Sequence, residues 1–515
     1  MKWFNTAGPC RPADNYMVSA TERLPEINRI IDHKGYFVLH APRQTGKTTL
    51  VLELAKKLTN EGKYAAVMLS VEVGAAFPDD VDKAEGAILG SWKTSARFWL
   101  PDELHPPQWE KTASGERIKT AISDWCLVCP RPLVIFMDEI DSLQNEVLIS
   151  VLRQLRAGFP ERPEGFPWSL ALIGLRDVRD YKVASGGSDQ LNTASPFNIK
   201  VRSLTLSNFT ESEVSNLLLQ HTAATGQVFT DEALRHAFYL TQGQPYLVNA
   251  LAKVAVEELV TDLAQPIELK DIDKSKDILI ERQETHLDSL AERLREPRVR
   301  AVIEPILAGN SLLNVPTDDI RFVKDLGLVI QKNGNGLEIA NPIYREVLPT
   351  VLSYVTRASM PKIAPNWLNE DGTLNADNLL EAFLKFWRQH GQPLLKSVHY
   401  HEIAPHIVLM AFLHRVVNGG GSLEREYAIG TRRMDVCLRY GDFTLGMELK
   451  VWRDGMREPL AEGLEQLDEY LNGLGLETGW LVIFDQRSGL PDISERTTTE
   501  TATTPQGKKI VIIRA

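Results

Sequence analysis

One short stretch constrains the fold of this 515-residue chain more than any other. Residues 36–40, Tyr-Phe-Val-Leu-His, form an apolar run that is typical of a buried β-strand. A tight loop, residues 41–49, follows this run, and residues 50–58 have the apolar spacing of an amphipathic helix. A strand, a loop and a helix in this order favour an α/β fold, in which helices cover a parallel sheet.

The loop carries Gly46-Lys47-Thr48 and has the spacing of a phosphate-binding P-loop, or Walker A motif. We expect its backbone amides to converge on a polyphosphate, assisted by the positive end of the following helix. Lys47 would reach the β- and γ-phosphates of ATP, and the Thr48 hydroxyl would be a ligand of Mg²⁺. Ala41 stands where the consensus opens with glycine, which concerns the turn rather than the phosphate cradle. The predicted nucleotide-binding residues of the loop are Gln44, Thr45, Gly46, Lys47, Thr48 and Thr49.

A second nucleotide motif follows about ninety residues later. Residues 133–137 are apolar and predict a central strand, which ends in Asp138 and Glu139. In an open α/β sheet, ligands bind at the carboxyl ends of the strands. We therefore expect Asp138 to hold Mg²⁺ through water and Glu139 to activate the attacking water, as in a Walker B motif. This partner motif argues against a chance Gly-Lys-Thr sequence.

A further strand, residues 168–175, leads into Arg176 and Arg179. Because its carboxyl end would face the same edge of the sheet, either arginine could sense the γ-phosphate. Ion pairs with Asp177 and Asp180 explain the same residues equally well, and both interpretations remain open.

Composition limits the class of protein. The length predicts three or four domains, and the net charge of −11 argues against a surface that is covered by nucleic acid throughout. No run of 18 apolar residues occurs, so we expect a cytoplasmic protein that does not enter a membrane. The four cysteines agree with a reducing compartment, and the lone Cys126–Cys129 pair is better explained as buried thiols than as a zinc site.

From residue 206 onward the pattern becomes helical. Thr210 and Thr230 begin capped helices, and Pro245 suits the first turn of a third helix after Gly243-Gln244. Together with the loop at 41–49 and the Asp138–Glu139 pair, this pattern resembles an AAA-like ATPase of the STAND-related branch over about residues 1–265. The resemblance implies a P-loop core with a helical lid. It also implies that the turn ending in Pro245 contacts the nucleotide and senses its state, and that Tyr16 and Met17 line the adenine pocket.

Residues 291–357 predict two helices, at 298–307 and 318–326, and a hairpin of strands 328–331 and 337–340 around Asn333-Gly334. This order resembles a winged-helix domain. Such domains bind DNA or pack on the ATPase lid, and the absence of an evident basic recognition helix favours packing. A polar linker follows at residues 358–378.

A second cluster of polar residues lies in the C-terminal part. Gly441-Asp442 predicts a two-residue hairpin turn, which pairs Tyr440 with Phe443 and sets Asp435 opposite Glu448. Their Cβ atoms would be about 5 Å apart on one polar face, with Lys450 beside them. Two carboxylates this close repel unless a cation lies between them, so a divalent metal is expected. The opposite face, with residues such as Val436 and Met447, would be the core side.

This arrangement resembles the PD-(D/E)XK nuclease superfamily over about residues 379–515, although Met434 replaces the proline of the name-giving dipeptide. The resemblance implies that Glu402 is a helical acid, that Asp435 and Glu448 bind the metal, and that Lys450 is the catalytic lysine. Gln466 and Tyr470 on the following helix would assist. The alternative is a solvated hairpin with alternating charges.

The predicted fold class is therefore α/β, with a P-loop three-layer ATPase core, a helical lid and a winged-helix domain, followed by a PD-(D/E)XK-like α/β domain. The expected boundaries are 1–205 for the core, 206–290 for the lid, 291–357 for the winged-helix domain, 358–378 for the linker and 379–515 for the nuclease-like domain.

The predicted function is ATP hydrolysis that regulates an Mg²⁺-dependent nuclease, with DNA as the favoured nucleic acid. One alternative is a STAND-like signalling ATPase whose nuclease-like domain binds a partner without cutting. Another is an ATPase that acts on nucleic acid without cleaving it. The sequence leaves open whether the chain forms a homo-oligomer.

Overall fold

The computed structural model describes residues 2–110, 112–175, 197–282, 285–307, 315–331, 336–348, 366–397, 404–417, 421–429 and 432–515. For residues 20–21, 285, 288, 291, 396–397, 424–429 and 432–435 it describes the backbone. The chain packs into two compact units, one of Met1–Glu281 with Arg321–Val329 and one of Arg282–Ile320 with Ile330–Ala515. No helix in the described ranges is long and apolar enough to cross a bilayer.

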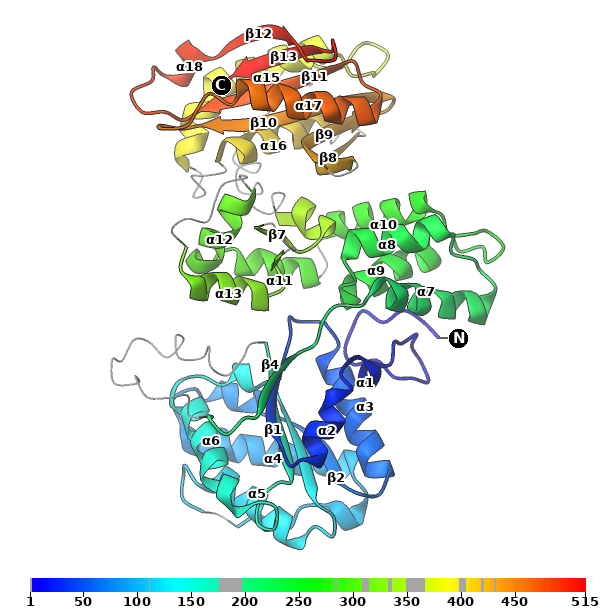
Figure 1. The fold of residues 1–515 in the computed structure, drawn as a ribbon, viewed down its shortest axis with the longest axis vertical. Helices are drawn as coiled ribbons and strands as arrows, with labels where there is room; N and C mark the ends of the chain where they lie inside the picture. The colour runs from blue at the N-terminus through cyan, green and yellow to red at the C-terminus, as the bar shows by residue number, and fades with distance from the viewer. Residues whose placement is uncertain are drawn as a thin grey trace. The chain divides into compact units, whose positions relative to one another are not determined.

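A parallel sheet forms the centre of the first unit (Figure 1). Within the described part of the chain it has five strands in the order β2-β3-β4-β1-β5, each parallel to its neighbours. The strands are β1 (Tyr36–His40), β2 (Ala65–Ser70), β3 (Leu133–Asp138), β4 (Ser169–Gly174) and β5 (Arg202–Thr205). The prediction of an α/β fold is confirmed, and β1 has the predicted bounds.

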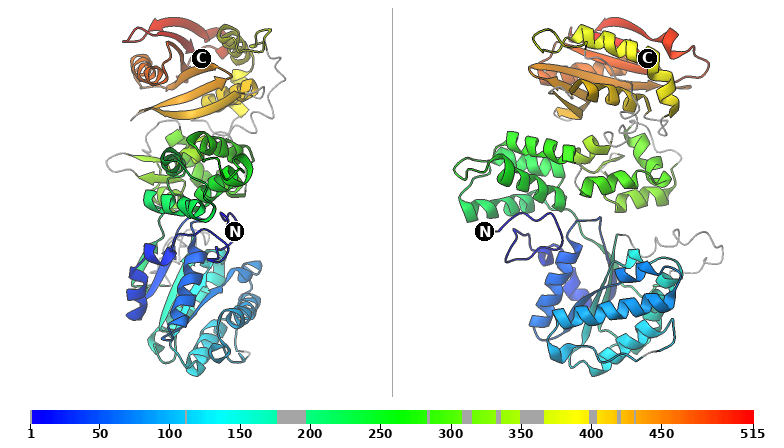
Figure 2. Two further views of the ribbon diagram at one scale, coloured as in Figure 1. Left: turned by 90° about the vertical axis from the view of Figure 1, so that its right-hand side faces the viewer. Right: turned by 180° about the vertical axis from the view of Figure 1, so that it is seen from behind.

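Helices cover both faces of this sheet (Figures 1 and 2). The helices of the core are α1 (Ala20–Arg23), α2 (Glu26–Asp32), α3 (Lys47–Asn60), α4 (Val81–Trp99), α5 (Arg117–Val128) and α6 (Asn145–Gly158). Short 3-10 helices lie at Glu72–Ala76 (η1), Asp102–Leu104 (η2), Ile140–Ser142 (η3) and Phe159–Glu161 (η4).

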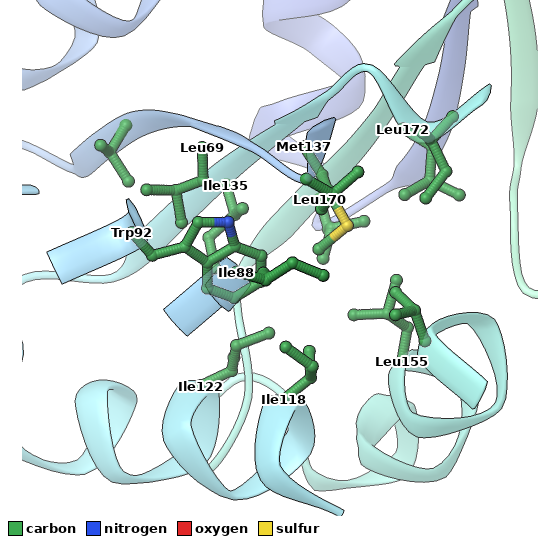
Figure 3. Close-up of a cluster of buried hydrophobic side chains, with 14 of the residues drawn as sticks. Leu69, Ile88, Trp92, Ile118, Ile122, Ile135, Met137, Leu155, Leu170 and Leu172 are labelled. Carbon is green, nitrogen blue, oxygen red and sulfur yellow. The ribbon is translucent and has the colours of Figure 1, made fainter. Parts of the chain in front are cut away.

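The side chains of β1 alternate between the two faces, because successive residues of a strand point in opposite directions. Tyr36 and Val38 join a cluster with α4, α5 and α6, whereas Phe37 and Leu39 join a cluster with α2 and α3. Figure 3 shows other members of the first cluster, including Leu69, Trp92 and Ile135. Burial on both faces explains why the first four residues of the strand are apolar.

The segment that was predicted to form the lid contains α7 (Glu211–Thr225), α8 (Asp231–Thr241), α9 (Pro245–Val254), the π-helix η7 (Ala255–Leu259) and α10 (Leu269–Arg282). Thr210 caps α7 in a reciprocal box with Glu213, and Thr230 caps α8 by accepting from the backbone of Ala233. Both predicted helix starts are confirmed. Pro245 is the first residue of α9, as predicted, where its missing N–H costs no helical hydrogen bond.

The segment that resembles a winged helix contains α11 (Thr285–Arg293), α12 (Pro297–Leu307), α13 (Thr317–Asp325), β6 (Val329–Gln331) and β7 (Leu337–Ile339). The strands β6 and β7 pair with each other. These elements occur close to the predicted helices and strands. The predicted Asn333-Gly334 turn lies outside the described residues.

The C-terminal part begins before the predicted boundary at residue 379. Trp367, inside the predicted linker, is buried, and its ring centroid lies 6.0 Å from that of Phe412. The helix α15 then starts at Ala376. The packed structure therefore includes the end of the segment that its polar composition predicted to be a linker.

A mixed sheet organises this C-terminal part. Its order in the described residues is β12-β13-β11-β10-β9-β8, with β10, β11 and β13 parallel and the remaining pairs antiparallel. The strands are β8 (Gly421–Ile429), β9 (Arg432–Tyr440), β10 (Phe443–Trp452), β11 (Thr478–Asp485), β12 (Thr498–Thr503) and β13 (Lys509–Arg514). The helices are α15 (Ala376–Ser397), α16 (Ala404–Val417), α17 (Leu460–Leu474) and α18 (Ile493–Arg496).

The expectation of a single core face for the β9–β10 hairpin is wrong, because helices cover both faces of this sheet. Leu481 packs with Leu467 of α17, whereas Phe484 of the same strand packs against Trp387 of α15. On β10 the buried residues accordingly include Met447 from one face and Glu448 from the other. The polar side chains of Glu448 and Lys450 on β10 therefore face α17 rather than open solvent.

Candidate functional site

The loop between β1 and α3 contains two residues in the left-handed backbone region. Gln44 and Gly46 have positive φ angles, 57° and 91°, and Gly46 is the N-cap of α3. Ala41 is not in the left-handed region, and its N–H donates to the carbonyl of Gly174 at 3.3 Å. The freedom of a glycine is therefore not needed at this position, which explains why alanine is accommodated there.

Lys47 lies with its ammonium inside the loop. Its Nζ donates to the carbonyl oxygens of Ala41 and Pro42, both at 2.8 Å. Burial lowers the pKa of Lys47, while the nearby Asp141 and Asp138 carboxylates act in the opposite direction. A buried ammonium bound to neutral carbonyls can form stronger, charge-assisted contacts with phosphate oxygens.

The two predicted magnesium ligands of this site contact each other. Thr48 Oγ1 donates to Asp138 Oδ2 at 3.1 Å, and the N–H of Glu139 donates to Asp138 Oδ1 at 2.9 Å. Burial raises the pKa of Asp138, although both of these hydrogen bonds oppose that shift. A hydroxyl and a carboxylate are hard oxygen donors that suit Mg²⁺, and a divalent cation would offset the cost of a buried carboxylate. The residues present fit the ion.

Glu139 lies just beyond the end of β3. It has a φ of 60°, and the 3-10 helix η3 starts after it. Partial burial, followed by repulsion from Asp138 and Asp141, raises the pKa of its carboxyl group. A raised pKa suits a residue that accepts a proton near neutral pH.

The sequence analysis missed the contribution of Asp141. Its Oδ1 accepts a hydrogen bond from the N–H of Leu175 at 3.1 Å, which connects the ends of β3 and β4. Its position could have indicated a role at this site, because Asp141 lies two residues after Glu139 in the sequence. Arg176 and Arg179, the candidate γ-phosphate sensors, lie outside the described residues.

The remaining predicted P-loop residues lie around the same loop. Thr45 is buried, and its Oγ1 donates to the carbonyl of Pro42 at 2.9 Å. Thr49 Oγ1 accepts from the N–H of Cys10 at 3.1 Å. Thr49 therefore contacts the N-terminal segment of the chain.

That segment, residues 3–17, is here named the N-terminal strap. The Tyr16 hydroxyl lies 3.2 Å from His221 Nδ1 on α7. The side-chain amide of Gln220 accepts from the Met17 N–H at 3.0 Å and donates to the Met17 carbonyl at 2.7 Å. The strap thus contacts both the P-loop helix α3 and the lid helix α7.

The turn before α9 makes a close contact with the connection between core and lid. Gly243 has a φ of 70°, and a Cβ added there would lie 1.8 Å from the carbonyl oxygen of Phe209. The N–H of Phe209 donates to the Gly243 carbonyl at 2.8 Å. Glycine is required here by its backbone angle and by the close approach of another backbone.

In the C-terminal part, the predicted hairpin register is confirmed for the described pairs. Phe443 pairs with Tyr440, and the pairing continues to Met447 with Val436. One further step in this register sets Asp435 opposite Glu448 on the backbone. Only the backbone of Asp435 is described, and Glu402 lies outside the described residues.

Lys450 connects β10 with α17. Its Nζ lies 3.1 Å from Glu448 Oε1 and 2.5 Å from Gln466 Oε1. A further oxygen, Glu462 Oε1, lies 3.6 Å away and accepts from Gln466 Nε2 at 3.2 Å. The structure therefore brings together the predicted residues Glu448, Lys450 and Gln466, and adds Glu462, which the sequence analysis missed.

Tyr470, predicted to assist with Gln466, packs against the buried Cys437. Among the described side chains no group of three His, Cys, Asp or Glu residues is arranged to hold a metal. The fit to a divalent ion rests on the buried carboxylate of Glu448 and on Asp435, which would stand opposite it if the observed register continues by one step beyond Met447 and Val436. Carboxylate oxygens from two adjacent strands are suitable ligands for Mg²⁺.

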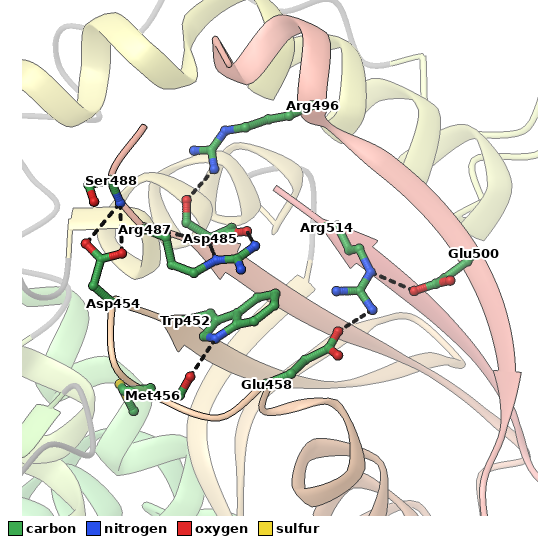
Figure 4. A network of polar contacts seen from close by, with 10 residues as sticks. All are labelled: Trp452, Asp454, Met456, Glu458, Asp485, Arg487, Ser488, Arg496, Glu500 and Arg514. Carbon is green, nitrogen blue, oxygen red and sulfur yellow. Dashed lines mark hydrogen bonds and ion pairs between the residues drawn. The ribbon is translucent and has the colours of Figure 1, made fainter. Parts of the chain in front are cut away.

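A rigid polar network surrounds the strand ends beyond Lys450 (Figure 4). The Arg487 guanidinium lies 3.4 Å from the centroid of the Trp452 ring and binds Asp485 through two hydrogen bonds, at 2.9 and 2.6 Å. Burial would raise the pKa of Asp485, but the bonds from Arg487 lower it overall. Arg514 contacts Glu458 and Glu500, both at 2.7 Å. These contacts hold the segment between Lys450 and α17.

The sheet, the loop around Lys47 and the acids at the end of β3 together define a P-loop ATPase. The model of one family, the AAA-like domain, matches residues 12–349. The chain belongs to this AAA-like family.

Solved structures were also compared with the chain. The Walker-type ATPase paby2304 of Pyrococcus abyssi has a TM-score of 0.47 and 14% identity, covering 67% of this chain and 99% of its own. RuvB of Thermotoga maritima, a Holliday junction branch migration motor, has a TM-score of 0.34 and 16% identity, covering 62% and 90%. Cdc6p of Pyrobaculum aerophilum has a TM-score of 0.35 and 12% identity, covering 66% and 94%. A search of curated proteins finds no match to the sequence.

Proposed function

We propose that the chain hydrolyses ATP and that its nucleotide state regulates a metal-dependent nuclease domain that acts on DNA. The domain boundaries predicted above, with the packed C-terminal part extended to Trp367, belong to this proposal. The ATPase half is supported by the family and by the contact between Thr48 and Asp138. The nuclease half depends on a single observation, the contact of Lys450 with the buried Glu448.

In the ATPase site each residue has a distinct role. Lys47 would exchange the carbonyls of Ala41 and Pro42 for phosphate oxygens. Thr48 and Asp138 would hold Mg²⁺, which neutralises phosphate charge when it is bound. Glu139 would take the proton of the attacking water, because its raised pKa keeps it a better base than an ordinary carboxylate.

This division of roles predicts different effects for two substitutions. Lys47→Ala should remove ATP binding, whereas Glu139→Gln should bind ATP and fail to turn it over. Binding of a fluorescent ATP analogue and phosphate release measure the two effects separately. Equal loss of nucleotide affinity in both variants would contradict the assignment.

In the nuclease site, Glu448 and Asp435 would hold a divalent ion, which supplies a Lewis acid to the scissile phosphate when bound. Lys450 would place its ammonium beside the phosphate and stabilise the negative charge that develops there. Gln466 would orient Lys450 from α17. Glu402 is assigned the role of the helical acid by resemblance.

A cleavage assay tests the nuclease directly. Wild-type protein with Mg²⁺ should cut DNA, and Asp435→Ala and Lys450→Ala should each abolish cutting while nucleotide binding stays intact. Single- and double-stranded DNA and RNA, each with and without ATP, identify the substrate. Normal cutting by either variant would refute the assignment.

The alternative function is a STAND-like signalling ATPase whose nuclease-like domain binds a partner without cutting. One observation favours it: α17 covers Glu448, and Lys450 contacts Glu448 and Gln466 as it would in a purely structural ion pair. Absence of cleavage on all four substrates, with ATP hydrolysis preserved, would support this alternative.

For the coupling between sites, we propose that ATP binding rearranges the lid and so controls access to the nuclease. Pro245, the predicted nucleotide sensor, opens α9, and the N-terminal strap joins Thr49 of the P-loop helix to Gln220 of the lid. A non-hydrolysable ATP analogue should therefore change the pattern of limited proteolysis. An identical pattern with and without the analogue would contradict the coupling.

A further inference from the structure

Glu462 has a geometry that distinguishes it from the other exposed acids of α17. Its Oε1 lies 3.6 Å from Lys450 Nζ, and its side chain is 67% exposed, against 19% for Lys450 and 4% for Glu448. Gln466, one turn later, donates to the same oxygen at 3.2 Å. Glu462 also lies in the first turn of α17, where the helix dipole favours a negative charge. The hydrogen bond from Gln466 therefore holds the Glu462 carboxylate near Lys450 on the side of α17.

A metal ion bound at this site would compete with Lys450 for the same carboxylate. Glu448 is its nearest carboxylate, at 3.1 Å, and is also the proposed metal ligand. An ammonium and a divalent cation that share one carboxylate repel each other. On α17, Gln466 Oε1 and Glu462 Oε1 lie 2.5 and 3.6 Å from Lys450 Nζ, and of these two groups Glu462 is the one whose negative charge could replace that of Glu448.

We propose that Glu462 is a positioning residue that holds the Lys450 ammonium against α17 and leaves Glu448 available to a divalent metal ion. The inference rests on the proposed nuclease function, because that function assigns the metal to Glu448. Glu462 does not contact the metal or the substrate. It acts through Lys450.

Metal binding without substrate gives the first test. Mn²⁺ binding is measured by electron paramagnetic resonance in the full chain, with Asp138→Asn present throughout to remove the ATPase metal ligand. Glu462→Gln should weaken Mn²⁺ binding about twofold to fivefold, the range of a partly exposed charge pair. In a Lys450→Met background the same Glu462→Gln change should have no further effect.

Three results of the metal titration would overturn the inference. One is unchanged Mn²⁺ affinity in Glu462→Gln, and another is an equal weakening in the Lys450→Met background, which would mean that Glu462 acts on the metal by its charge alone. The last is a wild-type titration identical to that of Glu448→Gln, which would remove the metal site and the proposed nuclease together.

Steady-state cleavage gives a second test that does not require the Lys450 variant to fold. Removing an exposed acid near a polyanionic substrate should by itself lower KM, and Glu465→Gln on the same helix measures that general effect. Glu462→Gln should in addition lower kcat severalfold, and Glu462→Asp should restore part of it. If Glu462→Gln behaves like Glu465→Gln, the inference fails while the nuclease stands. If the metal titrations succeed and wild-type protein cuts nothing, the nuclease fails and the role of Glu462 stands.

Discussion

Gly243→Ala should detach the lid from its connection to the core, and the structure allows its cost to be worked out. A Cβ at this position would lie 1.8 Å from the carbonyl oxygen of Phe209, whereas Cβ contacts below 3.0 Å essentially never occur. The Phe209 backbone would have to move by about 1.2 Å, the difference between these two distances. The hydrogen bond from Phe209 N–H to Gly243, now 2.8 Å, would then be lost or badly distorted.

Several terms add to this cost. A left-handed alanine costs about 1 kcal/mol or slightly more. The lost hydrogen bond adds about 1 kcal/mol, and repacking of the strained contact adds about 1–3 kcal/mol. The Arg23 guanidinium, 4.8 Å from the Phe209 ring centroid, would lose part of its cation–π contact, about 0.5 kcal/mol. The total is about 3.5–5.5 kcal/mol.

Gly226→Ala is the matched control. Gly226 ends α7 with a φ of 83°, but a Cβ there would meet nothing within 4 Å. It should therefore lose only the backbone term of about 1 kcal/mol. Hydrogen exchange of peptides from α7 and α9 measures the free energy of local opening in both variants. Equal opening free energies in the two variants would refute the claim that close approach to Phe209 makes Gly243 necessary.

Three further predictions concern titration and the strap. Because burial raises the pKa of Asp138, its ionised form destabilises the fold. Thermal stability should therefore rise as pH falls toward that pKa, and Asp138→Asn should stabilise the nucleotide-free protein at pH 7 while removing Mg²⁺-dependent hydrolysis. Burial lowers the pKa of His286 to about 4, so the stability gained from its neutral form is present above pH 6.5 and is lost as pH falls from 6.5 to 4. The free energy of unfolding measured by urea titration should fall by about 3 kcal/mol over this range in the wild type. The same loss should be absent in His286→Gln. Tyr16→Phe should increase hydrogen exchange in α7, with a loss of about 1 kcal/mol, because the hydroxyl that faces His221 is removed from a buried site.

Local patterns predicted the ATPase core well. The apolar run at β1, the turn residues of the P-loop and the acids after β3 are short-range signals, and each corresponds to a described element. The Gly441-Asp442 turn likewise predicted the hairpin register, since a two-residue loop leaves one way to pair its flanking strands. In each case the deciding residues are neighbours in the chain.

Contacts between distant residues could not be predicted in this way. The alternation in β10 indicated one core face, whereas α17 packs on the other face as well and brings Glu462 there beside the predicted Gln466. Gly243 was interpreted as part of a nucleotide-sensing turn, which stays a prediction, but its 2.8 Å hydrogen bond with Phe209, more than thirty residues earlier, was not predicted. Both outcomes depend on which helix packs where, and periodicity carries no information on that choice.

The burial of Glu448 beneath α17 has a consequence for how this domain can evolve. Replacing Lys450 alone would leave a carboxylate inside the protein without its ammonium partner, and uncompensated buried charges of this kind cost several kcal/mol. Replacing Glu448 alone would likewise leave the ammonium without its nearest carboxylate. In homologues that have lost the activity of this site, we therefore expect both residues to be replaced together by apolar residues, rather than one at a time.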